Sequence, residues 1–134
     1  DVAELTNLMH LELIRWGGTP VCPYCSSPRN TPHVAQKRYH CNTCNTSFSV
    51  TVGTPFHNTK IDLGKWYRAV YLIVEADREI TGRELARRLG VNRNTGCRMT
   101  LKIQTAMHQK DHRLLLLKIA QRVLEVQGEN AYEL

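Results

Sequence analysis

The sequence contains no apolar stretch long enough to cross a membrane. Its leucine run, Leu114–Leu117, is far shorter than the roughly 20 residues that a spanning helix needs. The N-terminus also lacks the basic segment followed by an apolar core that is typical of a secretory signal peptide. We therefore expect a cytoplasmic protein with no membrane partner.

Acidic residues are too few to balance the basic ones. The chain of 134 residues has 12 Asp and Glu against 18 Lys and Arg, which gives a formal net charge of +6. This surplus permits a nucleic acid or another anionic surface as partner but does not choose between them. Aromatic residues are few in residues 20–55, where only Tyr24, Tyr39 and Phe48 occur. Because stacking on RNA bases needs aromatic side chains, RNA is the less favoured nucleic acid.

Four of the five cysteines form two Cys-x-x-Cys pairs. Cys22 and Cys25 stand in CPYC, and Cys41 and Cys44 stand in CNTC, with 15 residues between the pairs. This spacing is typical of a zinc ribbon, because two tight turns complete the tetrahedral four-sulfur shell that Zn²⁺ prefers. Since protein atoms fill all four positions, we expect one structural Zn²⁺ rather than a catalytic ion.

Two other hypotheses exist for these cysteines. They could form two disulfides, or hold iron in the same shell. A reducing cytosolic setting favours metal over disulfide. His33 and His40 lie nearby in the sequence. Four thiolates already suffice, so we interpret His40 as a strand residue or as a hydrogen-bond partner of a ligand sulfur.

The segment before the first cysteine pair predicts a helix over residues 1–16. Gly17 and Gly18 end the pattern. A ribbon of about 35 residues is too small to hold a hydrophobic core alone, so we expect this helix to pack on it as a lid. Its predicted apolar face consists of Leu5, Leu8, Met9 and Leu13.

The ribbon itself is predicted over residues 20–55. One strand contains Tyr39, and a second follows the second cysteine pair, where Phe48, Val50 and Val52 alternate with polar residues. Residues 26–32 are rich in turn formers. Lys37 and Arg38 precede the strand with Tyr39, and they either contact phosphate or belong to a solvated hairpin.

Residues 61–108 are predicted to be helical. Asp62 caps a helix that runs to about residue 76. Thr81 and Glu84 form a capping box at the start of the next helix. Gly90 suits the left-handed turn that ends that helix, and Asn92 caps a further helix to about residue 108. The expected apolar face of the first of these helices is Trp66, Val70, Ile73 and Val74, with Tyr67 and Tyr71 at its margins.

Two helices joined by such a turn are typical of a helix-turn-helix, and the charges agree with this interpretation. The helix after Asn92 places Arg93, Asn94 and Arg98 on its outer face near its N-terminus. That is the part of a recognition helix that enters the major groove. The alternative is a solvated helix face. The full set of predicted DNA contacts is Asn92, Arg93, Asn94, Arg98 and Lys102, with Arg83, Arg87, Arg88, Lys37 and Arg38 for phosphates.

A leucine-rich helix is predicted over residues 111–127, followed by a loose polar tail. Its apolar surface must be buried. It therefore packs on the helix-turn-helix or pairs two copies of the chain into a homodimer. The predicted face is Leu116, Ile119, Ala120, Val123 and Leu124, widened by Leu114, Leu115, Leu117 and Val126.

These motifs, in this order, resemble the N-terminal region of bacterial zinc-ribbon insertion-sequence transposases of the DDE class, related to the Merlin elements. The resemblance covers about residues 11–108. It rests on LIRWGGTPVCPYCSS, on RYHCNTCNTSFSVTVGTPFHNTKIDLGKWYRAVYLI and on ELARRLGVNRNTGCRMTLKIQTAM. It implies that the cysteines are zinc ligands and that the region binds the terminal DNA of the element. Arg93, Asn94 and Arg98 carry over only as members of the recognition helix.

Such transposases continue into an RNase H-like domain whose acidic residues bind two metal ions. The acids after residue 108 lie on or just after one helix, so nothing brings them together, and we expect no strand-transfer activity. The chain is either part of a longer transposase or a small protein that kept the DNA-reading part. The leucine-rich helix favours the second origin.

The resulting expectation is a small α+β protein. Residues 1–58 hold the N-terminal helix and the zinc ribbon, and residues 59–134 hold the helix-turn-helix and the C-terminal helix. It would bind double-stranded DNA with sequence preference as a nucleoid-associated regulator of transcription. The alternatives are the terminal-repeat-binding portion of an active transposase, or an adaptor in which the ribbon docks a protein partner.

Overall fold

The computed structural model describes the backbone of the chain except residues 1, 58, 77 and 133–134, and side chains within residues 6–126. The chain divides into two compact units, Asp1–Asn58 and Thr59–Leu134, and each is described by itself. That each unit is an independently folding domain stays a prediction. Among the described residues, no helix is both long and apolar enough to cross a membrane.

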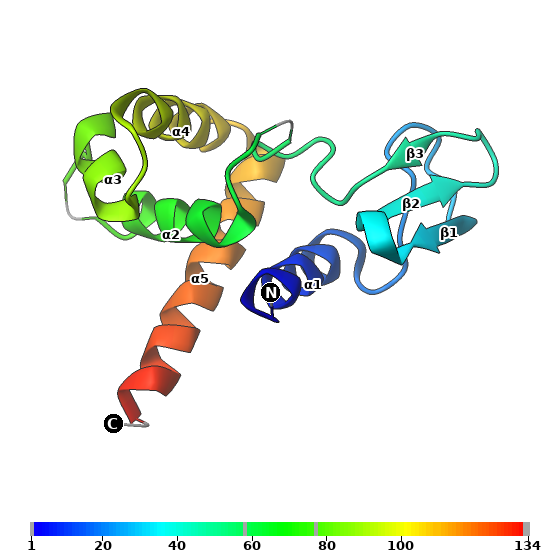
Figure 1. Cartoon of the computed structure of the whole chain (residues 1–134), viewed down its shortest axis with the longest axis horizontal. Coiled ribbons are helices and arrows are strands. Elements are labelled where there is room, and N and C mark those ends of the chain that lie inside the picture. Colours follow the sequence, from blue (N-terminus) through cyan, green and yellow to red (C-terminus); the bar gives the residue numbers. More distant parts are fainter. Residues whose placement is uncertain (1, 58, 77, 133–134) are drawn as a thin grey trace. The chain divides into compact units, whose positions relative to one another are not determined.

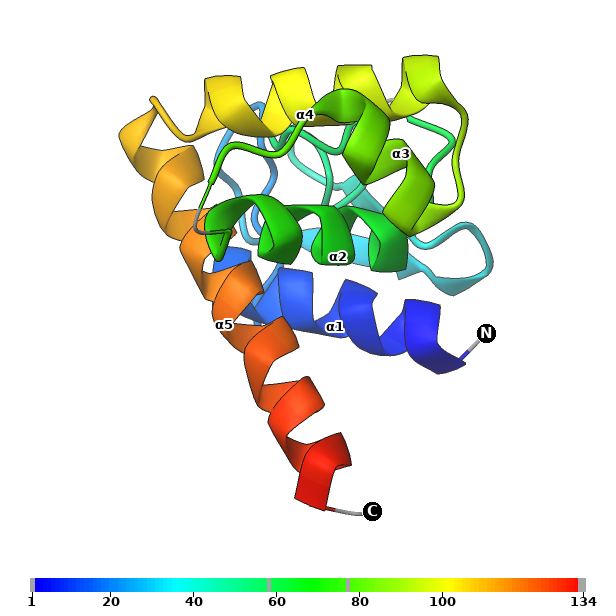
Figure 2. The same ribbon diagram turned by 90° about the vertical axis from the view of Figure 1, so that its left-hand side faces the viewer.

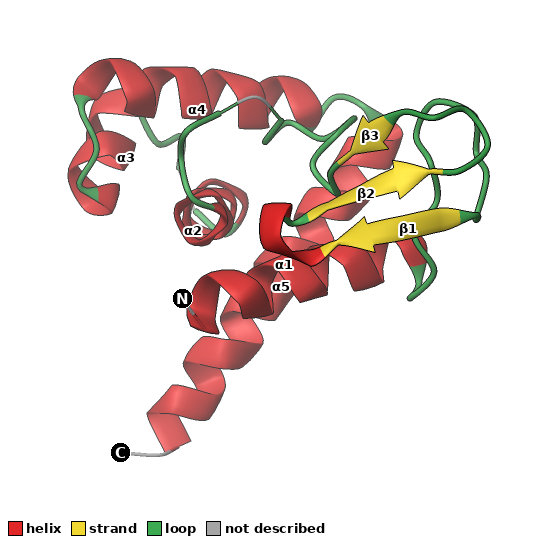
Figure 3. Cartoon of the chain, turned by 45° about the vertical axis from the view of Figure 1, so that its right-hand side comes forward, coloured by secondary structure: helices red, strands yellow, loops and turns green. Residues whose placement is uncertain are grey.

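The predicted small α+β class is confirmed. The first unit carries a three-stranded antiparallel sheet in the order β1-β2-β3, and the described chain has five α-helices (Figures 1 and 3). The elements of the first unit are α1 (Val2–Trp16), β1 (Asn30–His33), a short 3₁₀ turn (Val34–Gln36), β2 (Arg38–Cys41) and β3 (Ser47–Phe48).

Helix α1 packs on the sheet, which confirms the predicted lid. The edge of the Trp16 ring meets Tyr39 and Phe48, with ring centroids 5.6 and 5.9 Å away. The Tyr39 hydroxyl donates to a Glu12 carboxylate oxygen over 2.9 Å. Burial, together with this carboxylate, raises the pKa of Tyr39 to about 12, so the hydroxyl stays protonated and keeps donating.

The predicted apolar face of α1 is wrong in two positions. Met9 and Leu13 are 62% and 61% exposed, whereas Leu11 is fully buried. The helix is rotated about its axis relative to the prediction, because its contacts with the rest of the unit are partly polar: one Arg15 nitrogen donates to the carbonyls of Val50 and Val52 over 2.6 and 2.8 Å. The spacing of hydrophobic residues does not predict such polar contacts.

The second cysteine pair is followed by a shorter strand than the alternation predicts. β3 ends at Phe48, and residues 50–53 form turns in which the Val52 N–H donates to Ser49 and the Thr54 N–H to Thr51. Val50 is buried as expected, but the Val50 carbonyl accepts from Arg15 instead of a neighbouring strand. A strand also forms where turns were predicted: β1 covers residues 30–33, which overlap the turn-rich segment 26–32, and Thr31 lies opposite His40.

The second unit is helical, with α2 (Leu63–Val74), α3 (Gly82–Leu89), α4 (Arg93–Ala106) and α5 (Lys110–Tyr132). All three predicted N-caps are confirmed. The side chains of Asp62, Thr81 and Asn92 each accept from a backbone N–H three residues later, over 2.8, 3.1 and 2.8 Å. Each cap satisfies one N–H that has no partner inside its helix.

The other half of the predicted capping box is wrong. The Glu84 carboxylate pairs with Arg78 at 2.8 Å and with Arg88 at 3.1 Å instead of returning to the Thr81 N–H. Charge-assisted hydrogen bonds are stronger than neutral ones. The hydrogen bond from Arg78 lowers the pKa of Glu84, which stays ionised between its two arginines.

Three side chains of α2 differ in burial from the prediction. Tyr67 is 3% exposed rather than marginal, and burial raises its pKa more than the nearby Arg122 lowers it. Ile73 and Val74 are only half-buried, because α2 ends at Val74 rather than near residue 76.

Helices α3 and α4 pack against each other (Figure 2), and glycines lie where their backbones come closest. A Cβ added at Gly96 would lie 2.6 Å from the Ala86 Cβ and 2.5 Å from the Gly82 carbonyl oxygen. A Cβ added at Gly82 would lie 2.6 Å from the Cys97 Cα. The turn between the helices uses Gly90 in the left-handed conformation, with φ of 72°. The prediction for Gly90 is confirmed, and the small residues Ala86 and Gly96 lie where the two helices meet.

Helix α5 packs on α2. Leu116, Ile119 and Ala120 are buried as predicted, but Leu124 is 43% exposed. The predicted loose tail is wrong for residues 127–132, which continue the helix to Tyr132. Glu, Gln and Ala are good helix formers, and the single Gly128 costs only about 1 kcal/mol.

Replacing Gly96 by Ala tests the crossing of α3 and α4. In an open helix this change stabilises by about 1 kcal/mol, but here we expect a loss of about 1–3 kcal/mol, because backbone atoms must move apart. Thermal unfolding measures the difference. The matched control is Thr105→Ala on the exposed side of the same helix, which should not destabilise. An unchanged or raised midpoint for Gly96→Ala would refute the close crossing.

Candidate metal centre and nucleic-acid interface

The two cysteine pairs sit on two turns of the same construction. In each turn the N–H of the first cysteine donates to the carbonyl five residues later, to Ser27 and Thr46, over 3.0 and 2.9 Å. The residue after the second cysteine donates back to the first over 2.9 Å and has a positive φ, 63° at Ser26 and 58° at Asn45. Asn and small polar residues tolerate this left-handed conformation better than bulky ones.

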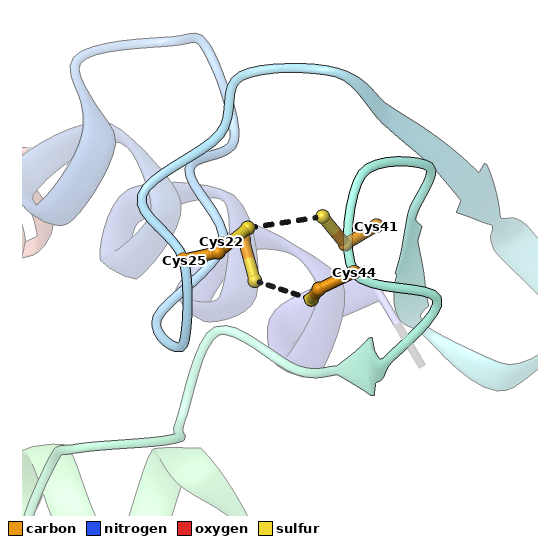
Figure 4. A group of neighbouring side chains, drawn as sticks. All are labelled: Cys22, Cys25, Cys41 and Cys44. Carbon is orange, nitrogen blue, oxygen red and sulfur yellow. Dashed lines mark hydrogen bonds between the residues drawn. The ribbon is translucent and has the colours of Figure 1, made fainter.

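These turns bring the four sulfur atoms together (Figure 4). The Sγ atoms of Cys22 and Cys44 are 3.7 Å apart, those of Cys25 and Cys41 are 3.5 Å apart, and all four lie within 4.8 Å of one another. A tetrahedral zinc site with Zn–S bonds of about 2.3 Å requires sulfur separations of about 3.8 Å. The donor set and its spacing fit Zn²⁺.

All four are free cysteines, so the structure has metal-ligand geometry rather than two disulfides. Among the described residues, the group that could hold a metal contains neither His33 nor His40. His40 is a residue of β2 and faces the His33 ring at a centroid distance of 6.3 Å. This confirms the simpler interpretation of His40 as a strand residue.

Backbone donors prepare one ligand for the metal. The N–H groups of Cys44 and Thr43 stabilise the thiolate of Cys41 and lower its pKa to about 6. At Cys25 the Ser27 N–H acts in the same direction, but desolvation and the three neighbouring thiols raise the pKa to about 12. Four thiolates at this spacing repel one another, and a divalent cation removes that repulsion.

The metal centre is tied to the apolar packing beneath it. Cys22 and Cys41 are buried with Phe48, against Trp16 and Tyr39, while Cys25 and Cys44 are exposed. The two turns are also linked directly, because the Ser27 and Thr43 hydroxyls are 2.8 Å apart. The four cysteines thus hold one structural Zn²⁺ that connects the turns to the small core under α1.

The second unit presents the basic residues predicted to bind DNA. Arg93, Asn94, Arg98 and Lys102 are all exposed, while Met99, Ile103 and Ala106 on the opposite side of α4 are buried. No acidic residue occurs in α4. The orientation of α4 therefore leaves these basic and polar side chains on its exposed side.

The other residues predicted to contact DNA differ in whether their side chains already pair with groups of the protein. On α3, Arg83 and Arg87 are exposed, whereas Arg88 is paired with Glu84. Asn92 caps α4 through its side-chain oxygen, Oδ1, which accepts from the Thr95 N–H. In the first unit, Lys37 is exposed, and Arg38 donates to the Ser47 hydroxyl and carbonyl over 2.9 and 3.2 Å.

Sequence reasoning passed over one residue at this surface. Leu101 is 66% exposed and follows Asn94 by seven residues, so both lie on one side of α4. Counting helical positions outward from Met99 and Ile103 would have placed Leu101 on the outer face. Cys97, which the sequence places beside Arg98 on the same helix, is exposed, and its Sγ would lie 2.6 Å from a Cβ at Gly82.

Comparison with known proteins agrees with the metal centre. Residues 4–47 match the family model described as the transposase zinc-ribbon domain. The predicted resemblance is confirmed for this segment. The matched segment includes most of α1 and all four cysteines, so the helix is part of the region that the zinc-ribbon family model describes.

A curated relative extends the similarity beyond the ribbon. The chain is 29% identical over 109 residues to an uncharacterized protein in transposable element ISH50 of Halobacterium salinarum. The alignment covers 79% of this chain and 36% of the relative, so the chain spans about a third of the relative's length. No solved structure matches the chain. These similarities support a nucleic-acid-binding role related to transposition.

Replacing Cys41 by Ser tests the metal centre. Removing one ligand should abolish stoichiometric zinc and unfold the ribbon, because zinc binding in such sites supplies folding free energy on the order of 10 kcal/mol. Metal analysis and circular dichroism measure both effects. The same exchange at the fifth cysteine, Cys97→Ser, is the control and should retain one zinc. A Cys41→Ser protein with the parent's zinc content and melting curve would contradict the assignment.

Proposed function

We propose that this chain binds double-stranded DNA with sequence preference, and that α3 and α4 act as a helix-turn-helix with α4 as the recognition helix. The observation that carries the proposal is the outer face of α4, where Arg93, Asn94 and Arg98 are exposed within the first two turns. An Arg can hold guanine and an Asn can hold adenine through two hydrogen bonds.

The surroundings of α4 suit a polyanion. Arg83 and Arg87 extend the positive charge along α3, and the N-terminus of α4 offers backbone N–H groups to a phosphate. The side-chain Oδ1 of Asn92 is engaged in the helix cap, so the side-chain NH₂ of Asn92 is the group that remains for DNA. Arg88 contributes less, because it is already paired with Glu84.

In the first unit, Lys37 and Arg38 are proposed as phosphate contacts. Lys37 ends the short 3₁₀ turn with a φ of 56° and is exposed. Arg38 keeps two hydrogen bonds to Ser47, which leaves part of its guanidinium for a phosphate. These contacts would add affinity without sequence information.

The biological role that we favour is that of a nucleoid-associated regulator derived from a transposase. It would occupy an operator or compete with a transposase for terminal repeats. That these residues carry no strand-transfer activity stays a prediction.

A second candidate is favoured by the length of the relative. Since the matched segment is 36% of that protein, the same residues could be the terminal-repeat-binding portion of an active transposase. Both roles require the same DNA surface. Pairing of two copies through α5 stays a prediction, supported by exposed leucines at Leu114, Leu117 and Leu124.

The double variant Arg93→Ala/Arg98→Ala tests the recognition helix. A target is first selected from genomic duplex fragments by gel shift. Each two-bonded base contact is worth about 1–3 kcal/mol, so affinity for the selected site should fall by at least tenfold, with a shallower salt dependence and an unchanged thermal midpoint.

The matched control removes two exposed arginines elsewhere, Arg68→Ala/Arg113→Ala, and lowers the net charge equally. It should retain most of the affinity. Equal losses in both double variants would mean that only net charge matters. Weak, uniform binding by the parent to all fragments would instead favour the adaptor that docks a protein partner.

A further inference from the structure

Leu101 occupies the middle of the outer face of α4. It is 66% exposed, and it follows Asn94 by seven residues and Arg98 by three, so the three side chains share one side of the helix. Helices α2 and α3 both contact α4 (Figure 2), and Met99 and Ile103, on the side of α4 opposite Leu101, are buried. A large apolar side chain therefore stands among polar and basic ones.

Exposure alone would mean little, because single exposed leucines are common on protein surfaces. The charge around Leu101 is more informative. Arg98 and Lys102 flank it, both are exposed, and α4 contains no acidic residue. Charge complementarity therefore favours a polyanion with an apolar group on its surface over an apolar protein surface.

Duplex DNA has one apolar group of this kind in its major groove, the C5-methyl group of thymine. Leu101 lies two turns along α4 from Arg93, a rise of about 12 Å, within the length that a recognition helix inserts. Building on the proposed function, we infer that Leu101 is a specificity-determining residue that contacts a thymine methyl group in the target.

The inference restricts the target sequence. The thymine must neighbour the base pairs that Asn94 and Arg98 reach, because the three side chains project together from α4. Replacing thymine by deoxyuridine removes only the methyl group and keeps every Watson–Crick hydrogen bond. The contact can therefore be tested without changing the rest of the site.

The experiment uses the zinc-loaded full chain and the duplex selected by gel shift. Each thymine is replaced in turn by deoxyuridine, and the dissociation constant is measured for the parent and for Leu101→Ala. At one or two positions we expect the parent to lose about fourfold in affinity, the effect of one apolar carbon returned to water. Leu101→Ala should show no loss at those positions.

Two controls accompany the measurement. Leu13→Ala removes a leucine of similar exposure, 61%, on α1, and should keep the parent's deoxyuridine profile. Because Leu101 is exposed, Leu101→Ala should also keep the parent's melting curve and sedimentation coefficient.

The outcomes separate this inference from the proposed function. Sequence-preferring binding with the same deoxyuridine profile in parent and Leu101→Ala would overturn the role of Leu101 and leave the DNA-binding proposal standing. A sedimentation coefficient that falls in Leu101→Ala, with an unchanged profile, would identify an interface between copies and also overturn it. If the parent prefers no fragment, both proposals fail.

Discussion

The crossing of α3 and α4 admits only small residues, and the basic surface depends on it. Gly96 lies against Ala86 and against the carbonyl of Gly82, which fixes the rotation of α4 about its own axis. With that rotation set, Met99 and Ile103 are buried and Arg93 and Arg98 are exposed. The Thr100 hydroxyl is buried too, but it donates to the Gly96 carbonyl over 2.9 Å, so the close approach leaves no buried hydroxyl unsatisfied.

The first unit solves a different problem, because its strands have only four, four and two residues. So small a sheet buries too little apolar surface to fold by itself. The structure compensates with a four-thiolate metal site and with α1, which packs on the sheet. The aromatic contacts of Trp16 and the two hydrogen bonds of Arg15 join the helix to the ribbon, and the buried Cys22 and Cys41 join the metal site to the same apolar cluster.

Local chemistry explains what could be predicted from the sequence. Asp62, Thr81, Gly90 and Asn92 act on neighbouring backbone groups, so their roles follow from a few adjacent residues, and the spacing of the cysteines limits the metal site in the same way. Contacts between distant residues were not visible. Arg15 donates hydrogen bonds to Val50 and Val52, which lie 35 and 37 positions away in the sequence. This contact sets the rotation of α1 about its axis, and it uses backbone carbonyls that lie beyond the end of β3. Leu101 was passed over because apolar residues were counted for the core and not for the outer face.

In the proposed complex, α4 enters the major groove of duplex DNA and the metal site stabilises only the ribbon. Amide chemical shifts of isotope-labelled, zinc-loaded protein, followed during titration with the selected duplex, report which residues meet the DNA. We expect the largest changes on the first three turns of α4 and on the adjoining turn at Gly90, with smaller changes at Lys37 and Arg38. Changes confined to the ribbon or to α5, with α4 unperturbed, would contradict it.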